Sequence, residues 1–395
     1  MNLPLVRATR KGADRVLSGH PWIFSSDIAD RGEAQAGDVV RVVDPAGHAL
    51  GLAHYSSTSK ISIRMLSAAA SDAGPEGLTR DFFLRRLGAA QQLRTRVVTD
   101  SDAYRLTHGE ADLLPGLVVD RYADYLVVQT LSQGMDRAKP LIVECLRELF
   151  APAAIVARND VAVRRSEALP LETAVLWGDA PPTAVIRMNC LRMEADLLHG
   201  QKTGVFLDQR ENYVAVARYA HGRALDAFTS TGGFGLHLAA RCESVEAVDS
   251  SAAALAVAAR NRDANALTGI EFVQAELFDY LAALARARRR FSTIVLDPPA
   301  FAKARGAVEG ALRGYREINR RALEMLEPGG VLVTCSCSHH VSEAALLEIV
   351  AAAALDAGRV LRVLERRTQS ADHPILLTVP ETHYLKCLIL ESVGT

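Results

Sequence analysis

The segment from Phe291 to Phe301, which reads FSTIVLDPPAF, constrains the fold of this chain more than any other. Its β-branched and apolar residues predict a buried parallel strand, because strands covered on both faces have nearly continuous apolar sequences. The two prolines after Asp297 cannot donate hydrogen bonds to a ladder, so the strand ends there. Open α/β sheets bind their ligands at the carboxyl ends of strands, which makes Asp297 a candidate site residue.

The chain after Gln201 alternates strand, glycine turn and helix, which is typical of a doubly wound parallel sheet. Asp226 lies just before a glycine turn at Gly232, Asp249 ends the second strand and Glu276 follows the third. Carboxyl ends of parallel strands share one edge of a sheet, so these acids should lie near one cleft. The pattern resembles the S-adenosylmethionine site of class I methyltransferases. Asp226 and the glycines would then flank the methionine part, Asp249 the ribose and Glu276 the adenine.

The rest of the chain predicts two further domains, and a length of 395 residues is enough for all three. Residues 1–70 hold short alternating segments broken by turn signals, which predict a β-rich domain. Residues 75–190 mix strands with helices, one of them over 78–98, and predict a small α+β domain. Residues 67–75 have the composition of a linker. Residues 191–395 form the α/β domain.

Composition excludes several classes of protein. The net charge of −1 gives no overall positive field, so any RNA binding must come from local patches. The basic run 286–290 is better explained as a solvated helix end. No apolar run approaches the roughly 18 residues of a membrane span, and the first residues do not resemble a signal peptide. The six cysteines are irregularly spaced, unlike a disulfide framework. We therefore expect a cytoplasmic protein without a membrane partner.

A second candidate site follows the apolar strand that starts at Gly329 and Gly330. This strand ends in the cysteines Cys335 and Cys337. A thiolate here could add to C6 of a pyrimidine and make C5 nucleophilic enough to accept a methyl group. Buried cysteines often behave as small hydrophobic residues, which we expect of Cys335. Zinc ligation is the alternative, but structural zinc sites use two separated ligand pairs, so we expect no metal.

Four segments match the motifs of one known family. They are KTGVFLDQR (202–210), FTSTGGF (228–234), DPPAF (297–301) and SCS (336–338). The chain departs from the family at Val205, where an aromatic residue is usual, at Ala300, which replaces a lysine, and at Ala275, which replaces an acid. Together the motifs resemble the bacterial 23S ribosomal RNA cytosine-C5 methyltransferase family.

The resemblance extends over nearly the whole chain. Residues 20–24 and 37–40 resemble the opening of a PUA domain, a small RNA-binding barrel, and residues 109–121 resemble the family's middle domain. Residues 371–374 and 384–386 also match the family, without a role that the sequence reveals.

The resemblance implies a Rossmann-like class I methyltransferase sheet, preceded by a β-rich PUA-like domain and a small α+β middle domain. It further implies S-adenosyl-L-methionine as cofactor, 23S ribosomal RNA as substrate, a covalent bond to cytosine C6 and a homodimer. The Ser-Cys-Ser motif assigns the nucleophile to Cys337, and Asp297 is the second catalytic residue. The expected cofactor-binding residues are Gln209, Arg210, Asp226, Phe228, Gly232, Asp249, Ser250, Glu276 and Asp297. The expected substrate-binding residues are Lys202, Pro298, Pro299 and Phe301.

Two other functions remain open at this stage. An RNA methyltransferase acting on the N6 amine of adenine or the N2 amine of guanine could use the same Asp297-Pro-Pro segment. That chemistry needs no thiol, so Cys337 distinguishes the two. The chain could also be a non-catalytic RNA-binding assembly factor that keeps the cofactor fold. The target nucleotide, and whether naked RNA or an assembled subunit is the substrate, cannot be read from the sequence.

Overall fold

A computed structural model describes residues 3–68, 78–200, 203–301, 306 and 308–393. Its contacts divide the chain into two compact units. The first unit contains residues 1–187, 195–205 and 371–382, and the second contains residues 188–194, 206–370 and 383–395. The three-domain division at residues 70–75 and 190–191 stays a prediction.

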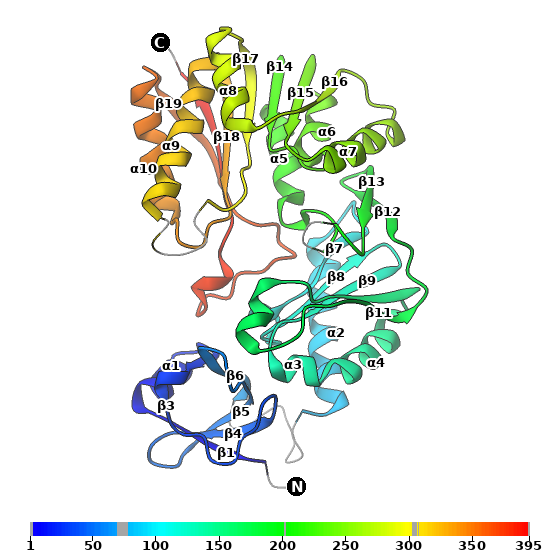
Figure 1. Cartoon of the computed structure of the whole chain (residues 1–395), viewed down its shortest axis with the longest axis vertical. Coiled ribbons are helices and arrows are strands. Elements are labelled where there is room, and N and C mark those ends of the chain that lie inside the picture. Colours follow the sequence, from blue (N-terminus) through cyan, green and yellow to red (C-terminus); the bar gives the residue numbers. More distant parts are fainter. Residues whose placement is uncertain (1–2, 69–77, 201–202, 302–305, 307, 394–395) are drawn as a thin grey trace. The chain divides into compact units, whose positions relative to one another are not determined.

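The first unit begins with a six-stranded sheet in the order β2-β6-β5-β4-β1-β3 (Figure 1). Its elements are β1 (Leu5–Ala8), α1 (Arg10–Leu17), β2 (Trp22–Phe24), η1 (Ser25–Asp27), β3 (Ile28–Asp30), β4 (Val39–Val43), β5 (Ala49–Tyr55) and β6 (Ile61–Ala68). A small core of alternating side chains, among them Val40, Val42 and Ile63, fills its inner face. Because β6 continues to Ala68, the predicted linker begins later than residue 67, and residues 69–75 lie outside the described part.

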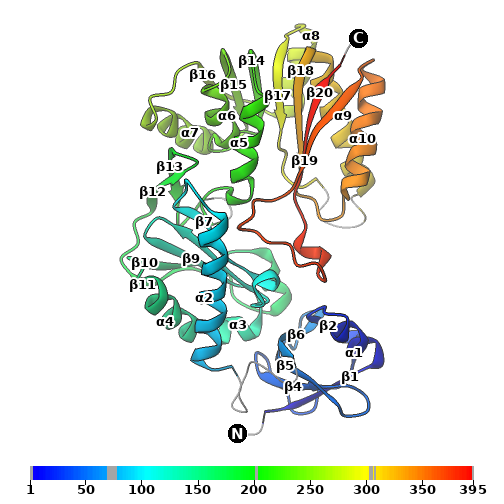
Figure 2. The same cartoon turned by 180° about the vertical axis from the view of Figure 1, so that it is seen from behind.

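A five-stranded sheet in the order β11-β10-β9-β8-β7 follows in the same unit. Its elements are α2 (Arg80–Val97), β7 (Ala103–His108), η2 (Gly109–Asp112), β8 (Leu117–Tyr122), β9 (Tyr125–Thr130), α3 (Gln133–Arg137), α4 (Lys139–Phe150), β10 (Ala154–Arg158), η3 (Ala162–Glu167) and β11 (Thr173–Gly178). Helix α2 confirms the helix expected over 78–98, and the Thr79 hydroxyl caps it by accepting from the Phe82 N–H. Figure 2 shows α2 beside the strands of this sheet. Phe82, Phe83 and Leu87 of α2 belong to the core that they share with the strands.

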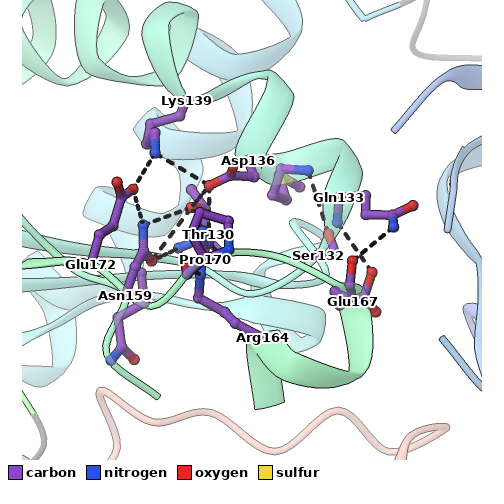
Figure 3. Close-up of polar contacts among 12 residues, drawn as sticks. Thr130, Ser132, Gln133, Asp136, Lys139, Asn159, Arg164, Glu167, Pro170 and Glu172 are labelled. Carbon is purple, nitrogen blue, oxygen red and sulfur yellow. Dashed lines mark hydrogen bonds and ion pairs between the residues drawn. The ribbon is translucent and has the colours of Figure 1, made fainter. Parts of the chain in front are cut away.

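Buried ionic contacts hold the irregular η3 segment of this unit in place (Figure 3). The Arg164 guanidinium donates to the carbonyls of Thr130 and Pro170 and to the Asp136 carboxylate. The Glu167 carboxylate accepts from the Gln133 N–H at 3.1 Å and from Arg64 Nη2 of β6 at 2.8 Å. A charge this deeply buried is tolerated only when it is paired. Glu167 thus links β6 to the five-stranded sheet.

The chain passes from the first unit to the second within a hairpin of β12 (Thr183–Met188) and β13 (Leu191–Asp196), which has Asn189 and Cys190 at positive φ in its turn. The second unit has a seven-stranded sheet in the order β16-β15-β14-β17-β18-β20-β19 (Figure 1). Strands β14 to β18 pair in parallel, and β20 runs antiparallel between β18 and β19. This arrangement confirms the predicted doubly wound sheet.

The strands of the second unit are β14 (Arg223–Ala227), β15 (Ser244–Asp249), β16 (Ile270–Gln274), β17 (Phe291–Leu296), β18 (Leu326–Ser336), β19 (Leu361–Arg367) and β20 (Lys386–Ser392). Its helices are α5 (Arg210–Tyr219), α6 (Gly233–Ala239), α7 (Ala252–Ala264), α8 (Leu277–Arg286), α9 (Val308–Met325) and α10 (Glu343–Asp356), with a short η4 (Leu207–Gln209). A further short segment, η6 (Pro380–Thr382), belongs to the first unit.

Apolar side chains of α8, α9 and α10 pack against one face of the seven-stranded sheet, where Leu281, Ile318 and Val350 meet Leu225, Ile294 and Leu332. The strand order reverses between β14 and β17, because the chain continues from β14 to β15 on one side and returns to β17 on the other. A crevice opens at such a switch point, beyond the carboxyl ends of the two strands. No helix among the described residues is both long and apolar enough to span a bilayer.

Candidate active site

A glycine turn follows β14 and leads into α6. Phe228, Ser230 and Gly232 all have positive φ, at 68°, 50° and 91°. A Cβ atom on Gly233 would lie 2.5 Å from the hydroxyl oxygen of Tyr213, so only glycine fits there. The turn therefore exposes backbone rather than side chain at the carboxyl end of β14, which lets a ligand approach closely.

Asp226 is fully buried beneath this turn. Its Oδ2 accepts from the Thr229 hydroxyl at 2.5 Å and from the Gly235 N–H at 2.7 Å, which fixes the turn. Its Oδ1 is buried and has no hydrogen-bond partner among the described residues. Burial raises the pKa of Asp226 to about 7, and the carboxylates of Asp297 and Asp249 add to the rise. A cationic or N–H donor placed at Oδ1 would satisfy this oxygen and favour its ionised form.

Asp249 ends β15, as predicted. One carboxylate oxygen accepts from the Ser230 N–H at 2.9 Å and the other from the Ser251 N–H at 2.9 Å. The carboxylate thereby joins the glycine turn after β14 to the end of β15. Ser250 lies between Asp249 and Ser251 in the sequence. Each oxygen keeps a lone pair, so Asp249 can still accept from two ligand hydroxyls.

Glu276 lies two residues beyond β16 and caps the start of α8. Its Oε2 accepts from the Phe278 N–H at 2.9 Å, and its side chain is exposed. A capping carboxylate stabilises its helix whether or not a ligand is present. Its predicted role toward adenine stays a proposal.

Asp297 directly follows β17, and its N–H donates to the Ala227 carbonyl at 3.4 Å, so it adjoins the end of β14. Pro298 is buried and Pro299 is exposed. The Phe301 ring packs against Tyr315 of α9, with 4.8 Å between ring centroids. The segment thus has a buried Pro298, a partly buried Phe301 and an exposed Pro299 between them.

The two cysteines at the end of β18 differ sharply in environment. Cys335 is fully buried and lies opposite Cys387 of β20. Burial raises the pKa of the Cys335 thiol well above its ordinary value, and Cys387 raises it further, so Cys335 stays protonated. Cys337 follows the last residue of the strand and is partly exposed. Of the two, only Cys337 can meet a substrate as a thiolate.

The residues around the start of α5 are buried. Arg210, expected to bind the cofactor, is the first residue of α5 and is 3% exposed. Asp208 lies in η4, where its Oδ2 accepts from the Tyr384 hydroxyl at 2.8 Å. Gln209 is also buried, and its Oε1 accepts from Asn212 Nδ2. Lys202 lies outside the described residues.

Sequence comparisons identify the two main parts of the chain. Residues 6–68 match the PUA-like domain family. Residues 105–389 match the S-adenosylmethionine-dependent methyltransferase family. The chain belongs to this methyltransferase family. Its cofactor is accordingly S-adenosylmethionine, as the sequence predicted.

Curated relatives of this methyltransferase match over almost their full length. A protein of Tolumonas auensis named ribosomal RNA large subunit methyltransferase I is 40% identical over 387 residues, which cover 96% of both chains. A protein of Aeromonas hydrophila with the same name is 40% identical over 392 residues, covering 97% of this chain and 98% of the relative.

Solved structures share the fold of this methyltransferase. A putative S-adenosylmethionine-dependent methyltransferase from Streptococcus mutans has a TM-score of 0.82 at 19% identity, covering 98% of this chain and 100% of the other. A putative methyltransferase complexed with SAH has a TM-score of 0.83 at 20% identity, with the same coverage. At this level of identity the likeness is one of fold.

The residues of this methyltransferase fit its cofactor. The buried Oδ1 of Asp226, which has no partner among the described residues, suits the ammonium of the methionine part. Asp249 has the acceptor capacity for the two ribose hydroxyls. The positive-φ turn at Gly232 leaves room for the backbone to approach the cofactor between them.

One network in the first unit was not predicted, although its residues belong to motifs noted in the sequence. Arg105 joins two buried acids. Its backbone N–H donates to Asp372 Oδ2 at 2.8 Å, and its side-chain Nε donates to Asp120 Oδ1 at 2.5 Å. Asp120 also accepts from the Thr203 hydroxyl, and Asp112 pairs with the buried Arg94. The motif residues at 112, 120, 203 and 372 therefore serve the folding of this unit. The charged residues within these motifs were the sequence signal from which this network could have been predicted.

Proposed function

We propose that this methyltransferase transfers a methyl group from S-adenosylmethionine to C5 of a cytosine in 23S ribosomal RNA, through a covalent bond between Cys337 and C6. The observation that carries the proposal is the position of Cys337. It is partly exposed just beyond the carboxyl end of β18, and the neighbouring strand β17 is followed directly by Asp297. The names of the curated relatives, ribosomal RNA large subunit methyltransferase I, support the choice of RNA.

The chemistry requires a thiolate because C5 of cytosine is a poor nucleophile. The Cys337 sulfur would donate an electron pair to C6, and the pair of the C5–C6 double bond would move to C5. The bound cofactor supplies an electrophilic methyl group, which C5 accepts. Loss of the C5 proton then restores the double bond and expels the Cys337 sulfur. This sequence is nucleophilic catalysis, with the sulfur regenerated at the end.

Asp297 is proposed to orient the base. Its carboxylate at the end of β17 could accept from the exocyclic amine of cytosine and stabilise positive charge that develops on the ring. Pro298, Pro299 and Phe301 would form the wall against which the base lies, and Lys202 would contact the RNA. A lysine is usual at position 300 in the family, so Ala300 removes one cation from this wall.

The cofactor is proposed to bind along the strand ends of the second unit. Asp226, Phe228 and Gly232 would hold the methionine part, Asp249 and Ser250 the ribose, and Glu276 the adenine. Gln209, Arg210 and Asp297 complete the proposed set. The buried Arg210 suits the cofactor's carboxylate, since guanidinium binds carboxylates bidentately.

The PUA-like domain at residues 6–68 is proposed to supply RNA affinity rather than chemistry. RNA affinity of such domains rests largely on phosphate contacts, which depend on salt. We further propose that the protein acts in the cytoplasm, where ribosomal RNA is modified, and that it forms a homodimer.

Trapping the covalent intermediate tests the function. RNA carrying 5-fluorocytidine at the target cannot lose the C5 substituent as a proton, so the bond to Cys337 should persist under denaturing conditions. Cys337→Ala should abolish both methyl transfer and the trapped complex, whereas the matched control Cys335→Ala should keep both. Cofactor affinity measured by calorimetry should be unchanged in both variants, which confirms that they are folded.

Other outcomes would identify a different function. Methyl transfer that persists in Cys337→Ala would point to an exocyclic amine as the acceptor, and a trapped complex lost only in Cys335→Ala would mean that the other cysteine is the nucleophile. No transfer by the wild-type protein to any ribosomal RNA substrate would favour an assembly factor.

A further inference from the structure

Lys386 is a buried cation beside the proposed nucleophile. It is the first residue of β20 and pairs with Ser336, the last residue of β18, in the antiparallel ladder. Strands β18 and β20 lie side by side in the seven-stranded sheet (Figure 2). Directly opposed residues of an antiparallel pair project to the same face of the sheet. Lys386 is only 5% exposed, which is rare for a lysine unless it is paired.

The contacts of Lys386 place its ammonium at the turn that carries Cys337. Its Nζ donates to the Ser338 carbonyl at 2.7 Å and to the Tyr384 carbonyl at 2.8 Å. The Ser338 hydroxyl also lies 3.4 Å from the Tyr315 hydroxyl of α9. The turn from Ser336 to Ser338 is therefore held from β20 and from α9.

These contacts leave the charge of Lys386 without a carboxylate partner. Among the described residues, no acid lies within ion-pair distance of Nζ, and both hydrogen bonds go to neutral carbonyls. An ammonium has three N–H donors, so a third remains in addition to these two. Burial lowers the pKa of Lys386 to about 8, while attraction from Cys337 and Glu343 opposes the decrease. Attraction between two groups is reciprocal, so a positive Lys386 favours the thiolate of Cys337.

Three other ionisable groups lie around this turn. Tyr315 of α9 interacts with Cys337 and with Asp297, and burial raises the pKa of its hydroxyl. Glu343, in the first turn of α10, acts on Lys386 and is paired with Arg366. His339 is exposed, and its ring lies toward Tyr384, with 5.7 Å between centroids.

We propose that Lys386 is a positioning residue for the reaction: its ammonium holds the Ser336–Ser338 turn and stabilises the Cys337 sulfur as a thiolate. This inference rests on the proposed role of Cys337 as nucleophile. The thiol proton leaves to water, and the sulfur keeps the electron pair that forms the bond to C6. Stabilising the thiolate needs the positive charge, which exists below a pH of about 8.

The test is the pH profile of Cys337 alkylation by iodoacetamide in the full-length protein, followed by mass spectrometry of the peptide that contains Cys337. Two variants separate charge from hydrogen bonding. Lys386→Gln keeps a donor for the Ser338 carbonyl but removes the charge, and Lys386→Arg keeps the charge. The exposed Cys190 is the internal reference in every sample.

We expect a wild-type inflection below about 8.5, the ordinary cysteine pKa. Lys386→Gln should raise this inflection by at least about one pH unit, the lower end of the effect of a nearby opposite charge, and Lys386→Arg should leave it low. A purely structural lysine would change the rate at all pH values without moving the inflection.

Two results would overturn the proposal. One is an unchanged inflection in folded Lys386→Gln; the other is a wild-type inflection at or above about 8.5, which needs no variant and decides the matter even if Lys386→Gln does not fold. Alkylation requires no RNA, so it is independent of the 5-fluorocytidine experiment. If the inflection shifts in Lys386→Gln but the trapped RNA complex still forms in Cys337→Ala, the proposed function is refuted and the interaction between Lys386 and Cys337 is supported.

Discussion

Cofactor affinity should depend on pH through Asp226, and the structure gives the size of the effect. Burial raises the pKa of this carboxyl to about 7, so it is mostly protonated at pH 5.5. A cofactor ammonium at Oδ1 binds the ionised form more tightly. With a pKa near 7, the ionised fraction rises from roughly 3% at pH 5.5 to roughly 50% at pH 7.0. Affinity for S-adenosylmethionine should therefore increase roughly 15-fold over this interval.

The assay is isothermal titration calorimetry of S-adenosylmethionine at half-unit steps between pH 5.5 and 7.0. Asp226→Asn keeps the shape and an acceptor for the Thr229 and Gly235 donors, so it should fold, bind weakly and show a nearly flat profile. The buried His237 does not interfere, because burial lowers its pKa to about 4. An equally steep profile in Asp226→Asn, or a flat profile in the wild type, would refute the assignment of Asp226 to the ammonium.

The same carboxyl also affects folding, and the sign follows from its protonation. Between pH 4 and 7 the folded protein holds a proton on Asp226 that the unfolded chain has released, because the folded pKa is raised from 3.8 to about 7. The contribution of this group to the free energy of unfolding therefore decreases as pH rises through that window. Bound cofactor, by favouring the ionised form, should offset the decrease.

Two further predictions concern the ribose site and the N-terminal domain. Asp249→Ala should weaken S-adenosylmethionine binding at least about tenfold by calorimetry, because a hydrogen bond to a charged group contributes about 1.5–3 kcal/mol; unchanged affinity in a folded variant would remove Asp249 from the site. Deletion of residues 1–70 should raise the dissociation constant for RNA and flatten its salt dependence without changing cofactor affinity. Glu167 loses Arg64 in that deletion, so the truncated protein should also carry Glu167→Gln to avoid an unpaired buried carboxylate. If the truncated and the full-length protein bind RNA with equal affinity at every salt concentration, the PUA-like domain does not contribute to RNA binding.

The sequence alone determined the sheet and the positions of its strand-end acids. Apolar runs that stop at Asp249 and before Asp297 mark strand ends, because a parallel strand buried on both faces must end where polar groups begin. The glycine turn at Gly232 was equally legible, since positive φ selects glycine locally. These features depend on a few consecutive residues, so a chain without a known structure still reveals them.

Only the tertiary structure decided the environment of each side chain. Arg210 is buried and Lys386 reaches the turn of Cys337, yet neither position differs from a surface residue in its local sequence. The pairing of β20 with β18 brings Lys386 to the turn of Cys337, because it joins segments far apart in the chain. The environments of Cys335 and Cys337 diverge for a related reason: Cys335 lies within the ladder opposite Cys387, whereas Cys337 lies just beyond it. Burial and proximity across a sheet depend on strand order, and strand order is a property of the whole fold.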